Sequence, residues 1–416
     1  MHVTIMPQPL SGTLDVISSK SMSHRCLIAA GLADGTSHIT HVLTSDDIIA
    51  TKAALRAFGV SFEGDDIIGG QRKIIEKDVN VKESGSTLRF MIPIYLLDDH
   101  DIVIHGEGRL AKRPLDDYQR LFESKGVTFE SLGKDSLPLK LKGKIKGGHY
   151  PIKGDVSSQF ISGLLFALPL RREDSVIELL TPLVSKGYVD MTLSVLKTFG
   201  IHVLNVDQYY YIKGSQCYIP QTIAIEGDYS QAAFWIVAGL IGNKTITLNN
   251  LKQDSVQGDK EMIGIVKAMG GHIIIQDDRL IIHPSVTNGI TIDLKDIPDL
   301  GPILMVLAAR STGKTTFVNC DRLRLKESNR LQAMMETLET FSVTHILDGD
   351  TLIVTGQETF RGSVTLSSHQ DHRIAMAIAI ASIRAIGPVT IIDAEAVQKS
   401  YPTFFDDFKK LGGMIQ

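Results

Sequence analysis

The stretch Leu55-Arg-Ala-Phe-Gly59-Val60 joins the end of a helix-like segment to the start of a strand-like one. Glycine suits the left-handed residue that closes a helix before the chain turns. Five similar stretches follow along the chain, namely Leu121–Val127, Leu196–Ile201, Val266–Gly271, Leu338–Val343 and Phe408–Gly413. Their small residues, at positions 59, 126, 200, 270, 342 and 412, recur every 67 to 74 residues. Six copies at a nearly constant interval indicate an internal repeat.

Each repeat is predicted to contain two helices and a small set of strands. Apolar residues at helical spacing indicate the helices, and strict alternation indicates the strands. In the first repeat the expected elements, in order, are Thr13–Ile17, Ser21–Ala33, His38–Leu43, Asp46–Phe58 and the hairpin Val60–Glu63 with Lys73–Glu76. In the third they are Ser157–Leu170, Ser175–Leu180, Tyr188–Phe199, Ile201–Leu204 and Tyr209–Lys213. The resulting βαβαββ order predicts an α/β fold with mixed sheets.

The two ends of the chain suggest how the repeats are grouped. The sixth repeat reaches the last residue, Gln416, before its final strand, whereas His2–Met6 is a strand-like segment that precedes the first repeat. We therefore expect the N-terminal strand to complete the sixth repeat. This predicts a discontinuous domain of residues 1–17 plus 227–416 and an inserted domain of residues 18–226. Three repeats in each domain, with two crossings of the chain, would leave a cleft between them.

Composition and charge exclude several functional classes. Of 416 residues, 43% are apolar and 22% are charged, which is typical of a soluble globular protein. The net charge of −4 predicts no general attraction to nucleic acid or to anionic membranes. Neither a signal peptide nor an apolar run long enough for a membrane span is expected. Three cysteines (Cys26, Cys217 and Cys320) share no CxxC spacing, which favours a reducing cytoplasm and thiols that pack as small core residues.

Unusual basic residues recur where the helices of the repeats are expected to begin. Serine and aspartate at such positions are ordinary N-caps. Lysine and arginine there oppose the helix macrodipole, at a cost of about 0.3–1 kcal/mol each. The basic residues in or near these turns are Lys20, Arg25, Arg113, Lys326, Arg330, Arg373 and Lys399. This repetition predicts a site for a ligand with several anionic groups, the alternative being solvated charges in six similar turns.

The densest cluster of charge is Arg322-Leu-Arg-Leu-Lys-Glu-Ser-Asn-Arg330. On a helix, Lys326 and Arg330 would lie one turn apart on one face, with Glu327 alongside. Neighbouring cations favour the ionised form of Glu327 whereas burial opposes it, and this competition suits a residue that transfers protons. The alternative is an ordinary charged surface of a helix. No cluster of histidines has metal-ligand spacing, and only His24 and His372, each near arginine, are expected near a site.

Taken together, these motifs resemble the 3-phosphoshikimate 1-carboxyvinyltransferases, also called 5-enolpyruvylshikimate-3-phosphate synthases, over essentially the full length of the chain. The matching motifs are Ser19–Arg25, Lys112–Pro114, Asp155–Gln159, Leu183–Lys186 with Tyr188, Glu226–Asp228, Ile297–Asp299, Arg324–Arg330, Asp371–Met376 and Lys399–Pro402. The resemblance implies two similar domains of three βαβαββ units each, of the inside-out α/β barrel type, with the active site in the interdomain cleft.

The resemblance also implies a reaction. The carboxyvinyl group of phosphoenolpyruvate is transferred to the 5-hydroxyl of shikimate 3-phosphate by addition and elimination, and phosphate is released. This is a step of the shikimate pathway toward chorismate and the aromatic amino acids, and glyphosate is the family's inhibitor. Both substrates carry a phosphate and a carboxylate, which explains many cations without a net positive charge. The resemblance implies no metal or organic cofactor, no nucleic acid and no membrane, and a cytoplasmic monomer is expected.

Residue roles follow from the matching motifs. Asp299 is the expected base at the attacking hydroxyl, Glu327 its acid–base partner, and Lys20 is expected to share in proton transfer. The residues expected to hold shikimate 3-phosphate are Lys20, Ser21, Arg25, Ser157, Ser158, Gln159, Ser185, Asp299 and Lys326. Those expected to hold phosphoenolpyruvate are Lys20, Gly85, Arg113, Gln159, Arg330, Arg373 and Lys399.

The sequence departs from the common family pattern at a few positions, and two alternative functions are disfavoured by particular residues. Residues Glu83–Phe90 read Glu-Ser-Gly-Ser-Thr-Leu-Arg-Phe, where members commonly have Asn-Ala-Gly-Thr-Ala-Met-Arg-Pro. A UDP-N-acetylglucosamine enolpyruvyl transferase would have a reactive cysteine between Gly106 and Pro114, and this chain has none there. A non-catalytic repeat protein that binds anions is disfavoured because both Asp299 and Glu327 are present.

Overall fold

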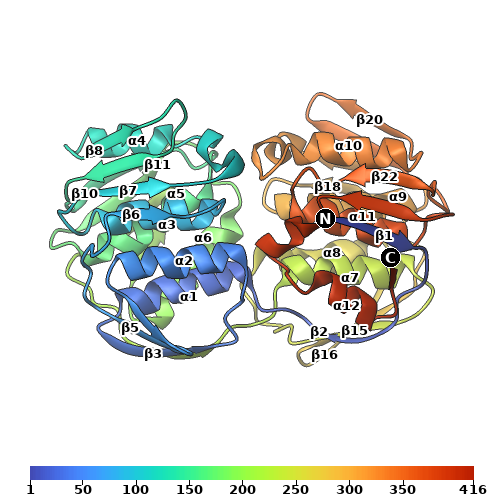
Figure 1. The fold of residues 1–416 in the computed structure, drawn as a ribbon, viewed down its shortest axis with the longest axis horizontal. Coiled ribbons are helices and arrows are strands. Elements are labelled where there is room, and N and C mark those ends of the chain that lie inside the picture. The colour runs from blue at the N-terminus through green and yellow to red at the C-terminus, as the bar shows by residue number, and fades with distance from the viewer. The chain divides into compact units, whose positions relative to one another are not determined.

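The computed structural model describes every residue from Met1 to Gln416 and divides the chain into two compact units. Unit 1 consists of Met1–Ser19 and Glu226–Gln416, and unit 2 of Lys20–Ile225. Each unit has three four-stranded sheets together with their helices. In Figure 1 the residues of unit 2 run from blue to green, and most of unit 1 runs from yellow to red.

The three sheets of unit 2 share one pattern, in which a parallel pair of strands is continued by two antiparallel ones. From edge to edge the first is β14 (Thr222–Ala224), β3 (Gly35–Thr40), β5 (Asp66–Gly69) and β4 (Ser61–Glu63). The second is β6 (Asp78–Asn80), β7 (Ile102–His105), β9 (Leu139–Lys142) and β8 (Thr128–Ser131). The third is β10 (Gly148–Ile152), β11 (Ser175–Leu179), β13 (Tyr209–Ile212) and β12 (Val203–Val206).

The sheets of unit 1 repeat this pattern and include both ends of the chain. The first is β2 (Gly12–Asp15), β15 (Ile246–Asn249), β17 (Arg279–His283) and β16 (His272–Gln276). The second is β18 (Thr291–Asp293), β19 (Lys314–Val318), β21 (Thr351–Thr355) and β20 (His345–Asp348). The third is β22 (Val364–Ser367), β23 (Val389–Ile392), β1 (His2–Met6) and β24 (Met414–Ile415). Figure 1 shows β1 in dark blue beside these red strands.

Burial shows which elements form the inside of each unit. The first helices of the repeats are buried on almost every side, and they are α1 (Lys20–Leu32), α3 (Gly85–Tyr95), α5 (Ser158–Ala167), α7 (Tyr229–Ile241), α9 (Gly301–Arg310) and α11 (His372–Ser382). A helix that is apolar all round belongs to a core. The strands instead alternate buried and exposed residues, as in β19, so each sheet buries one face and exposes the other. Helices inside and sheets outside are the inside-out arrangement that the family resemblance implies.

The second helices of the repeats are partly exposed, and short 3-10 segments precede several of them. These helices are α2 (Asp46–Ala57), α4 (Asp116–Glu123), α6 (Lys186–Thr198), α8 (Glu261–Ala268), α10 (Arg330–Thr340) and α12 (Phe404–Lys410). The 3-10 segments are η1 (Gly108–Lys112), η2 (Leu168–Leu170), η3 (Gly258–Lys260), η4 (Pro298–Leu300), η5 (Cys320–Leu325) and η6 (Ala394–Lys399). Because η1, η5 and η6 come first, α4, α10 and α12 begin after Arg113, Lys326 and Lys399, the basic residues near which these helices were expected to start.

Three details of the sequence prediction are wrong. The first hairpin returns at Asp66–Gly69 rather than at Lys73–Glu76, because Gly64 (φ 63°) and Asp65 form a two-residue turn directly after Glu63. The strand near residue 13 pairs with β15 of the fourth repeat, and β14 takes its place in the first, because alternation reveals a strand but not its partner. Cys26 and Cys320 are buried as expected, but Cys217 is exposed.

Candidate active site

Arg330, the first residue of α10, is the centre of the polar cluster in unit 1. Its guanidinium Nε donates to Oδ2 of Asp371 at 2.8 Å, and its Nη1 donates to Oδ1 of Asp299 at 2.7 Å. Its Nη2 donates to Glu327. The side chain of Arg330 is 1% exposed and that of Asp371 is fully buried. One guanidinium therefore connects three carboxylates that are far apart in the sequence.

The electrostatics of this buried pair favour the charged forms. Burial alone would lower the pKa of Arg330, but Asp371, Glu327 and Asp299 outweigh it and raise the pKa. Burial would likewise raise the pKa of Asp371, but Arg330 and then His372 hold the pKa below its usual value. The Asp371 carboxylate also caps α11 by accepting from the backbone N–H of Arg373 at 2.9 Å. Arg330 and Asp371 thus form a fixed, buried ion pair around which the rest of the cluster is arranged.

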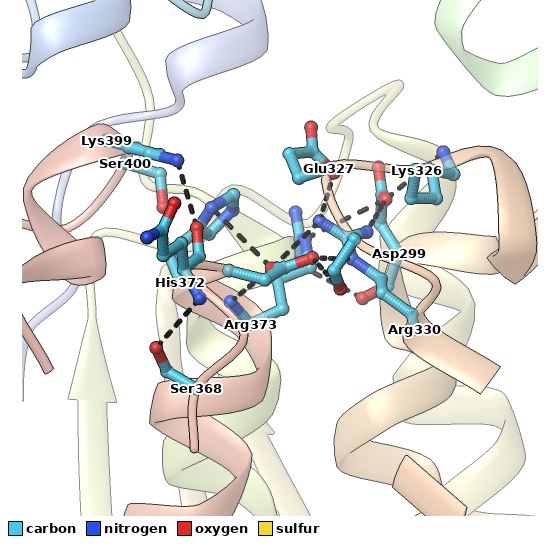
Figure 2. A network of polar contacts seen from close by, with 12 residues as sticks. Asp299, Lys326, Glu327, Arg330, Ser368, His372, Arg373, Lys399 and Ser400 are labelled. Carbon is cyan, nitrogen blue, oxygen red and sulfur yellow. Dashed lines mark hydrogen bonds and ion pairs between the residues drawn. The ribbon is translucent and has the colours of Figure 1, made fainter. Parts of the chain in front are cut away.

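Further cations approach Asp299, which lies in η4 just before α9. Lys326 Nζ is 3.2 Å from Oδ1 of Asp299, and Arg373 Nη1 donates to the backbone oxygen of Asp299 at 3.0 Å. Burial lowers the pKa of Lys326, and Asp299 opposes that shift. Figure 2 shows Lys326, Arg330 and Arg373 grouped around Asp299, with Lys399 on the far side of Arg373. Lys399 Nζ donates to the backbone oxygen of Gln370 at 2.9 Å.

A buried carboxyl group that the sequence analysis did not select lies near the same cluster. Asp259, in η3, is 6% exposed, and its Oδ1 has no hydrogen-bond partner. Burial, and then the charge of Asp299, raise the pKa of Asp259 to about 6, while Arg373 acts in the opposite direction. Asp259 stands just before α8, and because an aspartate at a helix start is also an ordinary cap, its residue type gave no distinct signal.

In unit 2, Lys20 and Arg25 lie on the first turns of α1. Lys20 Nζ donates to Oδ2 of Asp47 at 2.9 Å, and both side chains are mostly buried. Arg25 Nε donates to Oγ1 of Thr192 at 2.9 Å, and its Nη2 donates to the backbone oxygen of Tyr188 at 2.8 Å. Burial lowers the pKa of Arg25 to about 10, so the guanidinium remains charged at neutral pH. Arg25 therefore connects α1 with α6.

The start of α3 brings together three other expected residues. A Cβ atom built on Gly85 would lie 2.7 Å from Nη1 of Arg113, 3.1 Å from Nη1 of Arg89 and 3.7 Å from Oε1 of Gln159. Gln159 Nε2 donates to Oγ of Ser86 at 2.9 Å, and Arg89 Nη1 donates to Oε1 of Gln159 at 2.8 Å. Gly85 therefore leaves space for two guanidinium groups that a side chain would occupy.

The serines expected to bind shikimate 3-phosphate lie at helix starts in unit 2. Ser21 is the second residue of α1, and its backbone oxygen accepts from Arg25. Ser157 caps α5 by accepting from the N–H of Gln159 at 3.3 Å, and Ser158 is the buried first residue of that helix. Ser185 precedes α6 with a left-handed backbone (φ 54°). Such helix starts present backbone N–H groups that suit anionic ligands.

The structure brings some of the expected residues together in each unit, while Lys20 contacts Asp47 and Arg25 contacts Thr192. Asp299, Lys326, Glu327, Arg330 and Arg373 are joined by ion pairs in unit 1. In unit 2, Arg113 and Gln159 both lie beside the space that a side chain on Gly85 would occupy. The expectation that Lys326 and Glu327 lie on a helix is wrong, because α10 begins at Arg330. Lys326 nevertheless reaches Asp299, since the loop after η5 turns it toward the same carboxylate.

Several contributing residues were not selected from the sequence as site residues. They are Asp47, Arg89, Asp259 and Asp371, which contact or lie close to the expected residues. Each stands in or next to a motif at a helix start, but its type alone is explained by capping or by surface charge. Chemically, the two groups combine cations and helix N-termini, which bind phosphates and carboxylates, with carboxylates that can exchange protons.

Comparisons with known proteins agree with this chemistry. A family model described as EPSP synthase (3-phosphoshikimate 1-carboxyvinyltransferase) matches residues 5–408. A 3-phosphoshikimate 1-carboxyvinyltransferase from Clostridium novyi is 43% identical, over 100% of this chain and 98% of its own length. One from Clostridium kluyveri is 44% identical, with the same coverage.

Solved structures resemble the chain in fold. An EPSP synthase from Acinetobacter baumannii has a TM-score of 0.84 at 27% identity, covering 100% of this chain and 99% of that one. The enolpyruvyl transferase NikO from Streptomyces tendae has a TM-score of 0.80 at 16% identity, covering 100% and 98% of the two chains, and shows the fold alone. None of the helices is long and apolar enough to cross a membrane.

Proposed function

The chain belongs to the EPSP synthase (3-phosphoshikimate 1-carboxyvinyltransferase) family, and we propose that residues of both units act on the same two substrates. The enzyme transfers the carboxyvinyl group of phosphoenolpyruvate to the 5-hydroxyl of shikimate 3-phosphate and releases phosphate. The family model and the curated relatives all name the shikimate substrate, so a UDP-N-acetylglucosamine transferase is not favoured.

One observation supports the assignment of catalytic roles most strongly. Asp299 and Glu327 are held by different nitrogen atoms of the single buried guanidinium of Arg330. Two carboxylates are thereby fixed close together, while Lys326 and Arg373 supply further positive charge beside Asp299. Addition and elimination need both the removal and the delivery of protons around one carbon centre, and a pair of carboxylates can divide that work.

In the proposed reaction, Asp299 accepts the proton of the attacking 5-hydroxyl. An acid protonates the methylene carbon of phosphoenolpyruvate, and the hydroxyl oxygen attacks the adjacent carbon. Loss of a proton from the new methyl group and departure of phosphate then restore the double bond. Glu327 is the acid–base partner at the methylene carbon of phosphoenolpyruvate, and Lys20 shares in proton transfer. The cations stabilise negative charge on the phosphate as it leaves.

The remaining residues bind and orient the anionic groups. Shikimate 3-phosphate is held by Lys20, Ser21, Arg25, Ser157, Ser158, Gln159, Ser185, Asp299 and Lys326. Phosphoenolpyruvate is held by Lys20, Gly85, Arg113, Gln159, Arg330, Arg373 and Lys399. Support comes from the gathering of Gly85, Arg113 and Gln159 at the starts of two helices. Arg89 donates to Gln159 in the same place and thereby orients its amide.

A direct assay tests the function. Purified protein is given phosphoenolpyruvate with either shikimate 3-phosphate or UDP-N-acetylglucosamine, and phosphate release is measured. We expect release only with shikimate 3-phosphate. Release only with the nucleotide sugar would overturn the substrate assignment while leaving the chemistry in place. No release with either substrate, from folded protein, would instead favour a protein that only binds anions.

The role of Glu327 is tested by Glu327→Gln, which keeps the shape of the side chain but removes its acid–base chemistry. Turnover is expected to fall about 100- to 10,000-fold, while binding of shikimate 3-phosphate, measured by calorimetry, is retained. The matched control is Glu336→Gln on α10, where the carboxylate is half exposed and contacts Gln332 and His369. Full activity of Glu327→Gln would remove this carboxylate from the mechanism.

The same proposal places the enzyme in the cytoplasm as a monomer. Three free thiols, one of them exposed at Cys217, suit a reducing compartment. Sedimentation of the purified protein with both substrates present tests the oligomeric state, and a stable dimer would contradict it.

A further inference from the structure

A buried chain of hydrogen bonds connects three helices of unit 2. Nδ1 of His24 on α1 lies 2.7 Å from Oγ1 of Thr51 on α2, and that oxygen lies 2.6 Å from Oγ1 of Thr87 on α3. Thr87 in turn donates to Oγ of Ser84, the N-cap of α3, at 2.7 Å. All four side chains are at most 1% exposed. Buried hydrogen-bond networks of this kind favour one arrangement of the helices that they join.

The protons of this chain run in one direction. The single hydroxyl proton of Thr87 is donated to Ser84, so the Thr51 hydroxyl donates to Thr87 and Nδ1–H of His24 donates to Thr51. Burial, followed by the charges of Lys20 and Arg25, lowers the pKa of His24 well below its usual value. The imidazole is therefore neutral at pH 7, with its proton on Nδ1, and the chain adds no buried charge.

The middle of this hydrogen-bond network is connected to Lys20. The hydroxyl oxygens of Thr51 and Thr87 lie 3.3 and 3.4 Å from the backbone oxygen of Asp47. The carboxylate of the same Asp47 accepts from Lys20 Nζ at 2.9 Å. His24 also lies one helical turn after Lys20 on α1, on the same face. The two hydroxyls therefore pack against the backbone of Asp47, whose side chain holds the amine.

The other end of this hydrogen-bond network reaches the start of α3. Ser84 receives the Thr87 hydroxyl and also the Thr87 backbone N–H, so its side chain fixes the turn that precedes Gly85. Members of the family commonly have alanine at both of these positions, and alanine cannot supply a hydroxyl. Two of the four residues of the network, Ser84 and Thr87, thus stand at positions where this sequence departs from the common pattern.

We propose that Thr51 and Thr87 are positioning residues that hold Lys20 and the Gly85 turn in the geometry that binds phosphoenolpyruvate. This rests on the proposed function, in which Lys20 and Gly85 both contact that substrate. A displacement of about 1 Å between substrate-binding groups can lower activity by orders of magnitude, so a fixed spacing between α1 and α3 matters. Neither threonine touches the substrate, and their effect is exerted through Asp47 and Ser84.

The test compares Thr51→Val and Thr87→Val with Thr51→Ser and Thr87→Ser. Valine keeps the shape and removes the hydroxyl, whereas serine keeps the hydroxyl. We expect each valine variant to raise KM for phosphoenolpyruvate about tenfold and KM for shikimate 3-phosphate by less, because Lys20 contacts both substrates whereas the Gly85 turn contacts phosphoenolpyruvate alone. The serine variants should restore the parental KM. The double valine variant should differ little from either single one, because both substitutions interrupt one chain.

A matched control separates positioning from loss of any buried hydroxyl. Thr337 on α10 is also buried and donates to the backbone oxygen four residues earlier, but it belongs to no such chain. Thr337→Val should leave both KM values unchanged. If a valine variant fails to fold, Thr87→Ala replaces it, with the same expected rise and the same rescue by Thr87→Ser.

Three results would overturn the inference. They are an unchanged KM for phosphoenolpyruvate in folded valine variants, equal changes in KM for both substrates, and serine variants that behave like valine. The parental protein must first release phosphate with shikimate 3-phosphate. If it does not, the proposed function fails; if it does and the valine variants match it, only the positioning role fails.

Discussion

Asp371→Asn is the substitution that most directly tests the polar cluster of unit 1. Asparagine keeps the size of the side chain and can still cap α11, so the change removes mainly the negative charge beside Arg330. That charge is fully buried, and its oxygens lie 2.8 and 3.3 Å from Arg330 nitrogens. Ser328, which also donates to Asp371 at 3.0 Å, retains an acceptor.

The magnitude follows from burial and from the remaining partners. Removing one member of a buried ion pair costs about 3–5 kcal/mol, because the other charge is left uncompensated. Arg330 still has Asp299 and Glu327, so the lower end, about 3 kcal/mol, is expected. In a unit of this size each kcal/mol lowers the unfolding midpoint by about 2–4 °C, which gives a shift of about 6–12 °C.

Calorimetry of the full chain measures this shift. The control is Asp321→Asn, since Asp321 forms an exposed pair with Arg324 in the same unit and should matter little. A loss below about 1 kcal/mol for Asp371→Asn, or an equal loss for the control, would refute the role given to the buried pair.

The pH dependence of folding stability gives an independent check that the charge of Asp371 stabilises the protein. The pKa of Asp371 is lowered in the folded protein, because Arg330 outweighs burial. Its contribution to stability is therefore fully present above the unfolded value of about 4 and is lost as the pH falls through the folded pKa. The difference between the parental protein and Asp371→Asn should be constant from about pH 5 to 8 and should shrink below about pH 4.

Three further substitutions have expected outcomes. Burial raises the pKa of Asp259 to about 6, above its unfolded value, so ionisation of Asp259 costs folding stability as the pH rises through this range. Asp259→Asn should therefore stabilise unit 1 by about 2–3 kcal/mol at pH 8 and not at pH 4. An equal effect at both pH values would contradict this. Gly85→Ala places a methyl group 2.7 Å from Arg113 and should lower kcat/KM for phosphoenolpyruvate about 10- to 100-fold in steady-state kinetics; unchanged kinetics would show that Arg113 moves aside freely. Asp47→Asn weakens the charged contact to Lys20 and should lower kcat/KM about tenfold, and parental activity would show that Lys20 needs no such partner.

Much of the fold could be predicted from local patterns. The third repeat was expected to have helices at Ser157–Leu170 and Tyr188–Phe199, and α5 and α6 lie there within a few residues. The family and the fold class are confirmed by the family model and by the structural neighbours. Helices and strands are recognisable because their periods, 3.6 and 2 residues, are properties of neighbouring residues.

The site was predictable only in part, and the difference has a physical reason. Glu327 and Arg330 were selected from a dense cluster of charge and Asp299 from the family resemblance, and Arg330 does contact both carboxylates. Asp371 and Asp259 were not selected, because a buried aspartate and an ordinary N-cap look alike in sequence. Burial raises the free energy of a charged carboxylate and strengthens its interaction with neighbouring charges, and burial depends on the whole fold.

By itself, the sequence determined the sixfold repeat, the types of its elements and the cations at helix starts, since each of these depends on residues close together in the chain. Only the tertiary structure decided which strand β2 pairs with, that Lys326 reaches Asp299 from a loop, and that His24, Thr51 and Thr87 form one chain. Such contacts join residues tens or hundreds of positions apart. Their geometry is set by the packing of buried helices and by strand register, which no local pattern encodes.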